Sequence, residues 1–129
     1  MTPEFETALL LLVLLQVKHL LADFFFQTQK MLAGRDEYMH VGRMQHAGLH
    51  AIFSVFCLFA VGAPVGFILI LCSVEGVLHY HIDWAKGLHS AKTKYTPTDA
   101  GYWRAFGTDQ LLHQLTYVVM IWIWLKYAV

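Results

Sequence analysis

The stretch of sequence that decides the predicted fold is VGFILILCSVEGVLHYHIDWAK, residues 65–86. It is apolar over most of its length and reaches the length of about 20 residues that a helix needs to cross a membrane. It also carries Glu75, His79 and Asp83, each four residues from the next. Side chains at i and i+4 lie on one face of a helix, one turn apart. The stretch therefore predicts a membrane helix with one polar face.

The composition of the whole chain also indicates a membrane protein. Of its 129 residues, 57% are hydrophobic and 14% are charged, against roughly 45–50% and 25% in soluble domains. The formal net charge is zero, so no overall field attracts nucleic acid and we expect no such partner. Cys57 and Cys72 both lie in apolar runs, which predicts reduced, buried thiols.

Three more apolar runs accompany the first, and Gly62-Ala63-Pro64 forms a tight break between two of them. The chain is therefore predicted to be a single transmembrane domain, an all-α integral membrane four-helix bundle. We expect its helices at about residues 5–27, 46–61, 65–86 and 108–127. The run at 46–61 is short and could recruit residues before His46. The acidic start of the chain argues against a secretory signal.

The basic residues predict the orientation of these helices. Seven of the nine Lys and Arg residues fall in or beside the polar segments 28–45 and 87–107. Positive residues concentrate on the cytoplasmic side of a membrane, so both segments are predicted to be cytoplasmic and both termini outside. The aromatic and basic residues of 92–106 favour an interfacial stretch on anionic lipid over a gating loop.

Ionisable residues inside the predicted helices recur at the same i, i+4 spacing. Corrected for helix direction, they form two layers in the cytoplasmic half, about 6 Å apart at 1.5 Å per residue. The outer layer is Asp23, His46, Asp83 and Asp109. The inner layer is His19, His50, His79 and His113. Glu75 lies one turn deeper.

Imidazole and carboxylate groups from facing helices are typical ligands of a metal site in a bundle core. The eight residues of the two layers are therefore candidate ligands of a divalent metal. Zinc is favoured, with manganese or iron as alternatives, because no thiolate or thioether joins the set. Four ionised carboxylates would balance two ions, whereas one ion is enough if the aspartates support the histidines from outside. A proton relay or polar contacts between helices are the other interpretations of the same residues.

Three further polar residues have candidate roles. Glu75 is a candidate general base. Lys86, seven residues after His79, could hold a phosphate or an anionic lipid head, or could extend to the membrane surface as a positive-inside lysine. Lys18 either pairs with a carboxylate or extends poorly to the surface.

The motifs just described resemble a bacterial family of small, four-helix inner-membrane proteins of unknown function. The matching residues are His19-Leu20-Leu21-Ala22-Asp23-Phe24-Phe25-Phe26-Gln27, His46-x3-His50, Glu75-x3-His79-x3-Asp83-x2-Lys86 and Asp109-Gln110-x2-His113. That family is distantly similar to proteins described as membrane-bound metal-dependent hydrolases. The resemblance implies that these motif residues are functional.

The first functional hypothesis is metal-dependent hydrolysis of a phosphoester or acyl lipid at the cytoplasmic face of the bacterial inner (plasma) membrane, with membrane lipid as the surroundings. The second is a transporter or channel subunit for a divalent cation or protons, which would need a homo-oligomer because four helices cannot easily build alternating access. The third is b-haem ligation by histidines of facing helices.

Overall fold

All of the regular structure in residues 2–129, the part that the computed structural model describes, is helical. The chain forms four long helices, with a π-helical turn and one short helix between the first two of them. Their bounds are α1 Pro3–Leu20, η1 Leu21–Phe25, α2 Gln29–Leu32, α3 Val41–Ala60, α4 Val65–Thr93 and α5 Ala100–Tyr127. No strand occurs in this described range, which confirms the predicted all-α class.

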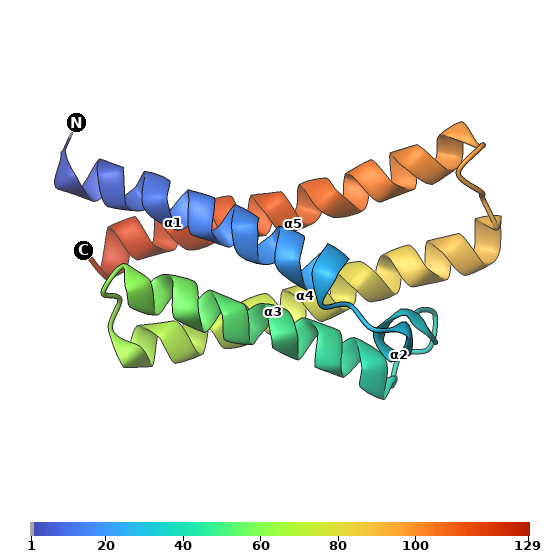
Figure 1. Cartoon of the computed structure of the whole chain (residues 1–129), viewed down its shortest axis with the longest axis horizontal. Coiled ribbons are helices and arrows are strands. Elements are labelled where there is room, and N and C mark those ends of the chain that lie inside the picture. The colour runs from blue at the N-terminus through green and yellow to red at the C-terminus, as the bar shows by residue number, and fades with distance from the viewer. Residues whose placement is uncertain (1) are drawn as a thin grey trace.

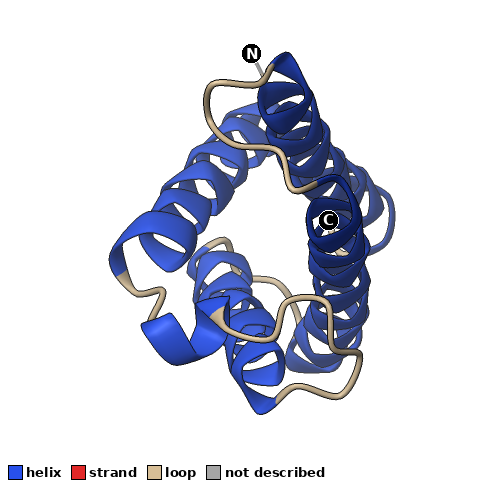
Figure 2. Cartoon of the chain, turned by 90° about the vertical axis from the view of Figure 1, so that its right-hand side faces the viewer, coloured by secondary structure: helices blue, strands red, loops and turns tan. Residues whose placement is uncertain are grey.

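The four long helices run up and down beside one another (Figure 1). α1 packs against α3 and α5, and α4 also packs against α3 and α5. The order around the bundle is therefore α1, α3, α4, α5, and the end-on view shows the helices arranged around a common axis (Figure 2). Both termini and the turn between α3 and α4 lie at one end, and the segments 26–40 and 94–99 lie at the other (Figure 1).

Within residues 2–129, two helical segments, not four, are long and apolar enough to cross a membrane: Pro3–Phe25 and Val65–Thr93. This corrects the expectation of four spans by the same measure of length and composition. The reason lies in the polar residues of the other two helices. α3 includes Arg43, His46 and His50, and α5 includes Asp109 and His113, all of which lower the average hydropathy although they are buried inside the bundle.

The observed helices also differ in length from the predicted ones. α3 begins five residues before His46, α4 continues to Thr93, and α5 begins at Ala100. Much of the predicted polar segment 87–107 is therefore helical, and only residues 94–99 connect α4 to α5. These extensions mix polar and charged residues with apolar ones, so they contain no continuous apolar run from which a span could be placed.

The segment 28–40 closes one end of the bundle because two helical glycines let its backbone approach. A Cβ at Gly42 would lie 1.9 Å from the Lys30 carbonyl oxygen, and one at Gly87 would lie 2.0 Å from that of Arg35. The buried Arg43 side chain donates hydrogen bonds to the carbonyls of Gly34, Arg35 and Tyr38. The connection is thus held against both α3 and α4.

A short turn connects α4 to α5. Lys94 ends α4 in the left-handed region, with φ of 53°. The backbone N–H of Thr96 donates a 2.7 Å hydrogen bond to the Asp99 carboxylate, and the Thr96 hydroxyl donates another of 2.8 Å. These bonds stabilise the ionised form, so they hold the pKa of Asp99 below its ordinary value.

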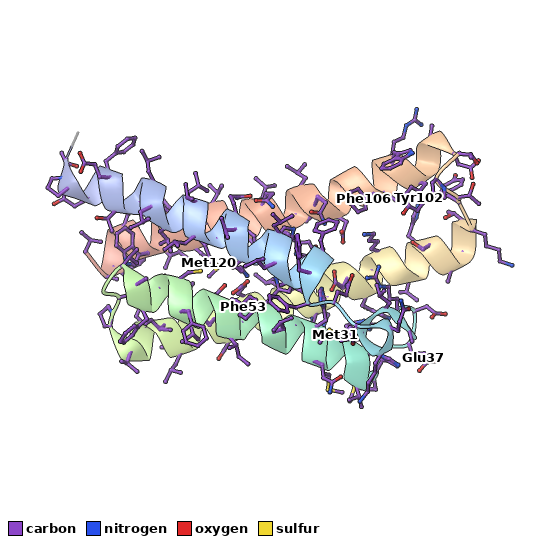
Figure 3. All side chains as sticks on the ribbon, viewed as in Figure 1. Met31, Glu37, Phe53, Tyr102, Phe106 and Met120 are labelled. Atoms are coloured by element: carbon purple, nitrogen blue, oxygen red, sulfur yellow. The ribbon has the colours of Figure 1, made fainter. Side chains whose placement is uncertain are left out.

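The end of the bundle that holds the termini has an apolar core. Leu11 and Leu15 of α1 meet Leu58 of α3, and Met120 and Trp124 of α5 complete the packing. Met120 lies between the helices in this half (Figure 3). The buried thiols of Cys57 and Cys72 belong to the same core and are unbonded. The polar candidate residues are therefore confined to the other half.

Candidate metal centre

Each long helix contributes inward-facing imidazole or carboxylate groups to one cluster. The structure brings together all eight residues of the two predicted layers, in contacts that mostly run from an outer aspartate to a histidine one turn deeper. The five histidines among them are at most 5% exposed. Each of these histidines contacts at least one of the three aspartates, Asp23, Asp83 and Asp109.

Asp23 is the centre of the first group. It lies on η1, the π-helical turn that ends α1. Its Oδ1 is 2.9 Å from His50 Nε2 and 3.3 Å from His46 Nε2, and its Oδ2 is 3.4 Å from His19 Nε2. Single π turns inside α-helices occur often at functional sites, and here the turn directs a carboxylate toward α3.

Asp83 of α4 is the centre of the second group. Its Oδ2 lies 3.3 Å from His79 Nε2 and 3.5 Å from His46 Nε2, while its Oδ1 lies 3.3 Å from His113 Nε2. His46 therefore contacts both aspartates and links the two groups. The imidazole rings also pack closely: His50 stacks on His79 with ring centroids 3.8 Å apart, and His79 lies 4.2 Å from His113.

The distances between these groups match ligands around one ion better than ordinary hydrogen bonds. Most nitrogen–oxygen separations are 3.3–3.6 Å. Two ligands on a tetrahedral zinc ion, with bonds of about 2.0–2.1 Å, lie about 3.3–3.4 Å apart. His79 Nε2 is buried and has no hydrogen-bond partner. A buried imidazole nitrogen without a partner is unfavourable unless something binds it.

Two overlapping sets of side chains in the described residues could hold a metal ion, as the predicted metal cofactor requires. One set is Asp23, His46, His50 and His79, and the other is His79, Asp83 and His113. Within each set, one donor atom per residue lies within 4.8 Å of every other. His19 and Asp109 stand outside both sets and contact their members.

Asp109 lies at the edge of the cluster and is paired with Lys86. Its Oδ2 accepts a 2.9 Å hydrogen bond from Lys86 Nζ, and its Oδ1 is 3.6 Å from His113 Nε2. The Lys86 ammonium also lies 4.8 Å from the centre of the Phe106 ring. Lys86 thus faces the cluster through Asp109 and does not simply extend outward.

Glu75 lies on the far side of the cluster from the segment 28–40, in an ion pair with Lys18. The Lys18 Nζ to Glu75 Oε1 distance is 2.5 Å, and both side chains are at most 4% exposed. The pair crosses the bundle from α1 to the diagonal helix α4. It answers the open question about Lys18, which pairs with a carboxylate. The general-base role of Glu75 stays a prediction, and in this structure its carboxylate is paired with Lys18.

Two further residues contact the cluster: Gln110, which belongs to the motif Asp109-Gln110-x2-His113, and Tyr117, which was not among the predicted residues. The Tyr117 hydroxyl lies 3.0 Å from His19 Nδ1. The Gln110 amide contacts His19 Nε2 at 2.9 Å and Asp23 Oδ2 at 3.4 Å. Tyr117 follows His113 by four residues, so extending the spacing of α5 by one turn would have found it.

The other three histidines lie outside the cluster. His81 contacts Tyr38 through its Nε2, at 3.1 Å from the hydroxyl, on an exposed face of α4. His89 is exposed near the end of α4, and His40 packs over Gly34 in the segment 28–40. His81, on the same helix as His79, provides a matched control for substitutions in the cluster.

The molecule is thus a helical bundle with a buried cluster of histidine and aspartate that could hold a metal ion. The chain belongs to a family described as a protein of unknown function (DUF3307), whose model matches residues 10–129. This confirms the predicted membership of an uncharacterised family. No curated protein matches the chain. No solved structure matches it either.

Proposed function

We propose that this protein is an integral membrane protein that binds a divalent metal ion and uses it for hydrolysis at the cytoplasmic face of a bacterial inner membrane. The single observation that carries the proposal is the set of His–Asp contacts around Asp23 and Asp83. The membrane, the ion and the reaction each rest on separate arguments, given below.

The surface of the bundle supports a membrane location for all four long helices. Their outward faces are apolar, whereas the buried side chains of one half are charged or polar. This applies to α3, where Ile52, Phe56 and Phe59 are exposed, as well as to α5, where Val118 and Trp122 are exposed. Soluble monomers rarely expose continuous apolar surface of this kind. The polar residues that lower the hydropathy of α3 and α5 face inward, where they do not oppose contact with lipid.

The orientation follows from the basic residues. The segments with most of the Lys and Arg lie at one end of the bundle, and both termini lie at the other (Figure 1). The positive-inside rule then puts the cluster in the cytoplasmic half and both termini outside. Fusion of a reporter to the C-terminus tests this arrangement.

The charges in the cluster favour one divalent ion. Glu75 is neutralised by Lys18, and Asp109 is neutralised by Lys86. Asp23 and Asp83 contact histidines but no Lys or Arg in the described residues. With neutral imidazoles, two negative charges remain. Burying them without compensation is strongly unfavourable, and one divalent cation balances them.

Asp23, His46, His50 and His79 are the proposed ligands, because they are the larger of the two sets. Three imidazoles and one carboxylate suit zinc, with manganese or iron as alternatives. Gln110 and Tyr117 hold His19 beside them. Such supporting contacts orient the groups around a metal.

The chemistry that a bound divalent metal supplies is activation of water near neutral pH and polarisation of a phosphoryl or acyl oxygen. The chain must also accept and return a proton. Asp83 and His113 are in contact with each other and lie outside the proposed ligand set, so they are the proposed acid–base pair. Asp109, held by Lys86, orients His113 from its other side.

The test is the metal content and the hydrolytic activity of protein purified in mild detergent. We expect about one zinc, manganese or iron ion per chain and hydrolysis of p-nitrophenyl phosphate or a short acyl ester. His50→Ala should lose both, whereas His81→Ala, at an exposed histidine outside the cluster, should keep both. Metal-free wild-type protein, or equal metal in wild type and His50→Ala, would overturn the proposal.

The structure favours the two alternatives less. For transport, the polar chain of His50, Lys18 and Glu75 leads inward from the cluster, but the apolar core of the other half offers no polar continuation. For haem, the histidine rings are 3.8–5.6 Å apart, which leaves no space between them for the macrocycle. Ion flux in vesicles and an absorbance spectrum test these two alternatives.

A further inference from the structure

A basic cavity lies between the end of α4 and the start of α5, beside the cluster. Its volume is about 470 Å³, and Lys86, His89 and Arg104 supply its basic groups. Asp109 also lines it, and Asp109 is the residue that contacts His113 of the cluster. Figure 3 shows Tyr102 and Phe106 on this part of α5. Lys86 is held in place by Asp109 and by the face of the Phe106 ring.

An apolar groove continues from this cavity along the same two helices. Its volume is about 380 Å³. Ile82 and Leu112 line both spaces, so the groove and the cavity are contiguous. Leu78, Leu115 and Val119 line the groove further along. Glu75 also reaches it, with its charge balanced by Lys18.

The dimensions of the groove match one leaflet of a membrane. Along α4 it extends from Ile82 to Leu71, which is about 16 Å at 1.5 Å per residue. Half of a hydrocarbon core is about 15 Å thick. The basic cavity lies toward the end of the bundle that carries the segments 26–40 and 94–99, where the proposed orientation puts the lipid head groups.

We infer that the α4–α5 surface binds a lipid with a phosphate head group, with the phosphate at Lys86 and Arg104 and the acyl chain in the groove. Arg104 has no ion-pair partner in the described residues, so its guanidinium is available to a phosphate, which it can bind through two hydrogen bonds. The pair of Lys86 and Asp109 places that phosphate next to His113. This inference rests on the proposed function in two respects, the membrane orientation and the identification of the bound lipid as the substrate.

The experiment measures binding of dioctanoyl phosphatidate to purified protein in a neutral detergent by titration calorimetry. Arg104→Gln should weaken binding by about tenfold, the loss expected for one hydrogen bond to a charged group. Lys92→Gln removes a basic residue of α4 that does not line the cavity, and its affinity should equal that of wild type. Equal affinity of Arg104→Gln and wild type would overturn the inference.

The acyl chain is tested separately. Leu115→Trp fills the groove and should weaken binding of the lipid, whereas Val118→Trp, on an exposed position outside it, should not. Glycerol 3-phosphate, which has no chain, and dioctanoylglycerol, which has no phosphate, should both bind more weakly than the phosphatidate. If glycerol 3-phosphate binds as tightly as the phosphatidate, the cavity binds a soluble phosphate and the inference is wrong.

Metal analysis of the same samples separates this inference from the proposed function. Metal-free protein that still binds the phosphatidate in the predicted way would remove the proposed metal chemistry and keep the lipid site. Metal-containing protein that does not bind it would remove the lipid site alone.

Discussion

The two halves of the bundle are built from the same four helices but have opposite interiors. At the end with the termini, Leu11, Leu15 and Leu58 pack with Met120 and Trp124. At the other end, the same bundle buries five histidines and Asp109, and it partly buries Asp23 and Asp83, which contact those histidines. The outer surface is apolar along both halves. The apolar half shows that these helices can pack mainly through apolar side chains, so packing alone does not require the histidines and aspartates of the polar half.

The largest expected effect is in the polar half. We predict that His79→Ala loses the bound metal, from about one ion per chain to near zero, because His79 belongs to both sets of potential ligands. His81→Ala, two residues further along on another face of α4, should keep it. The measurement is elemental analysis of both variants after gel filtration in detergent. Retained metal in His79→Ala would remove α4 from the site. The predicted metal ligands would then no longer distinguish the polar half from the apolar half.

The ion pair of Lys18 and Glu75 lies at the boundary of the two halves, and substituting it tests whether its charges stabilise the fold. We predict that Lys18→Met destabilises the protein by about 3–5 kcal/mol, because it leaves the Glu75 charge buried and unpaired. The double variant Lys18→Met/Glu75→Leu should recover most of that stability. Denaturant unfolding in mixed micelles, followed by circular dichroism, gives both values. A double variant no more stable than the single one would show that the pair has a role beyond charge balance.

A comparable loss of stability, here caused by lost packing, is expected in the apolar half. We predict that Leu15→Ala, at a fully buried position, lowers the free energy of unfolding by about 2–5 kcal/mol. Its metal content should not change, since Leu15 is in the apolar core. Unfolding measurements and elemental analysis on one preparation test both statements. Metal loss in Leu15→Ala would mean that the two halves are coupled.

The sequence predicted those features of the polar half that depend on residue spacing within a helix, but it did not predict contacts between distant helices. The i, i+4 spacing placed His79 and Asp83 on one face of a helix, and the agreement of four segments on depth placed their partners at the same level. The spacing and the depth of each residue are read from its own helix, without knowledge of which helices are neighbours. The pairing of Lys18 with Glu75 joins diagonal helices, so no local pattern reveals it. The extension of α4 to Thr93 was missed because helices outside the apolar run have no hydropathy signal.

The smallest expected effect is at a polar group outside both halves. Asp99 is fully exposed and accepts hydrogen bonds from Thr96, which lower its pKa from an ordinary value of 3.8. A carboxylate whose pKa is lower in the folded state stabilises that state above its unfolded pKa, and the stabilisation is lost as the pH falls through the folded value. We therefore predict that Asp99→Asn is slightly less stable than wild type at pH 7 and that the difference shrinks as the pH falls below about 3.8, toward the lowered pKa of the folded state.

Thermal unfolding of both proteins between pH 7 and pH 3 is the measurement for Asp99. The difference should be small because water and salt screen an exposed charge. Asp36→Asn is the matched control, because the Asp36 carboxylate accepts no hydrogen bond in the described residues, and it should be as stable as wild type at pH 7. A large, pH-independent loss in Asp99→Asn would instead mean that the turn between α4 and α5 supports the buried cluster. The polar half would then depend on its loops as well as on its helices.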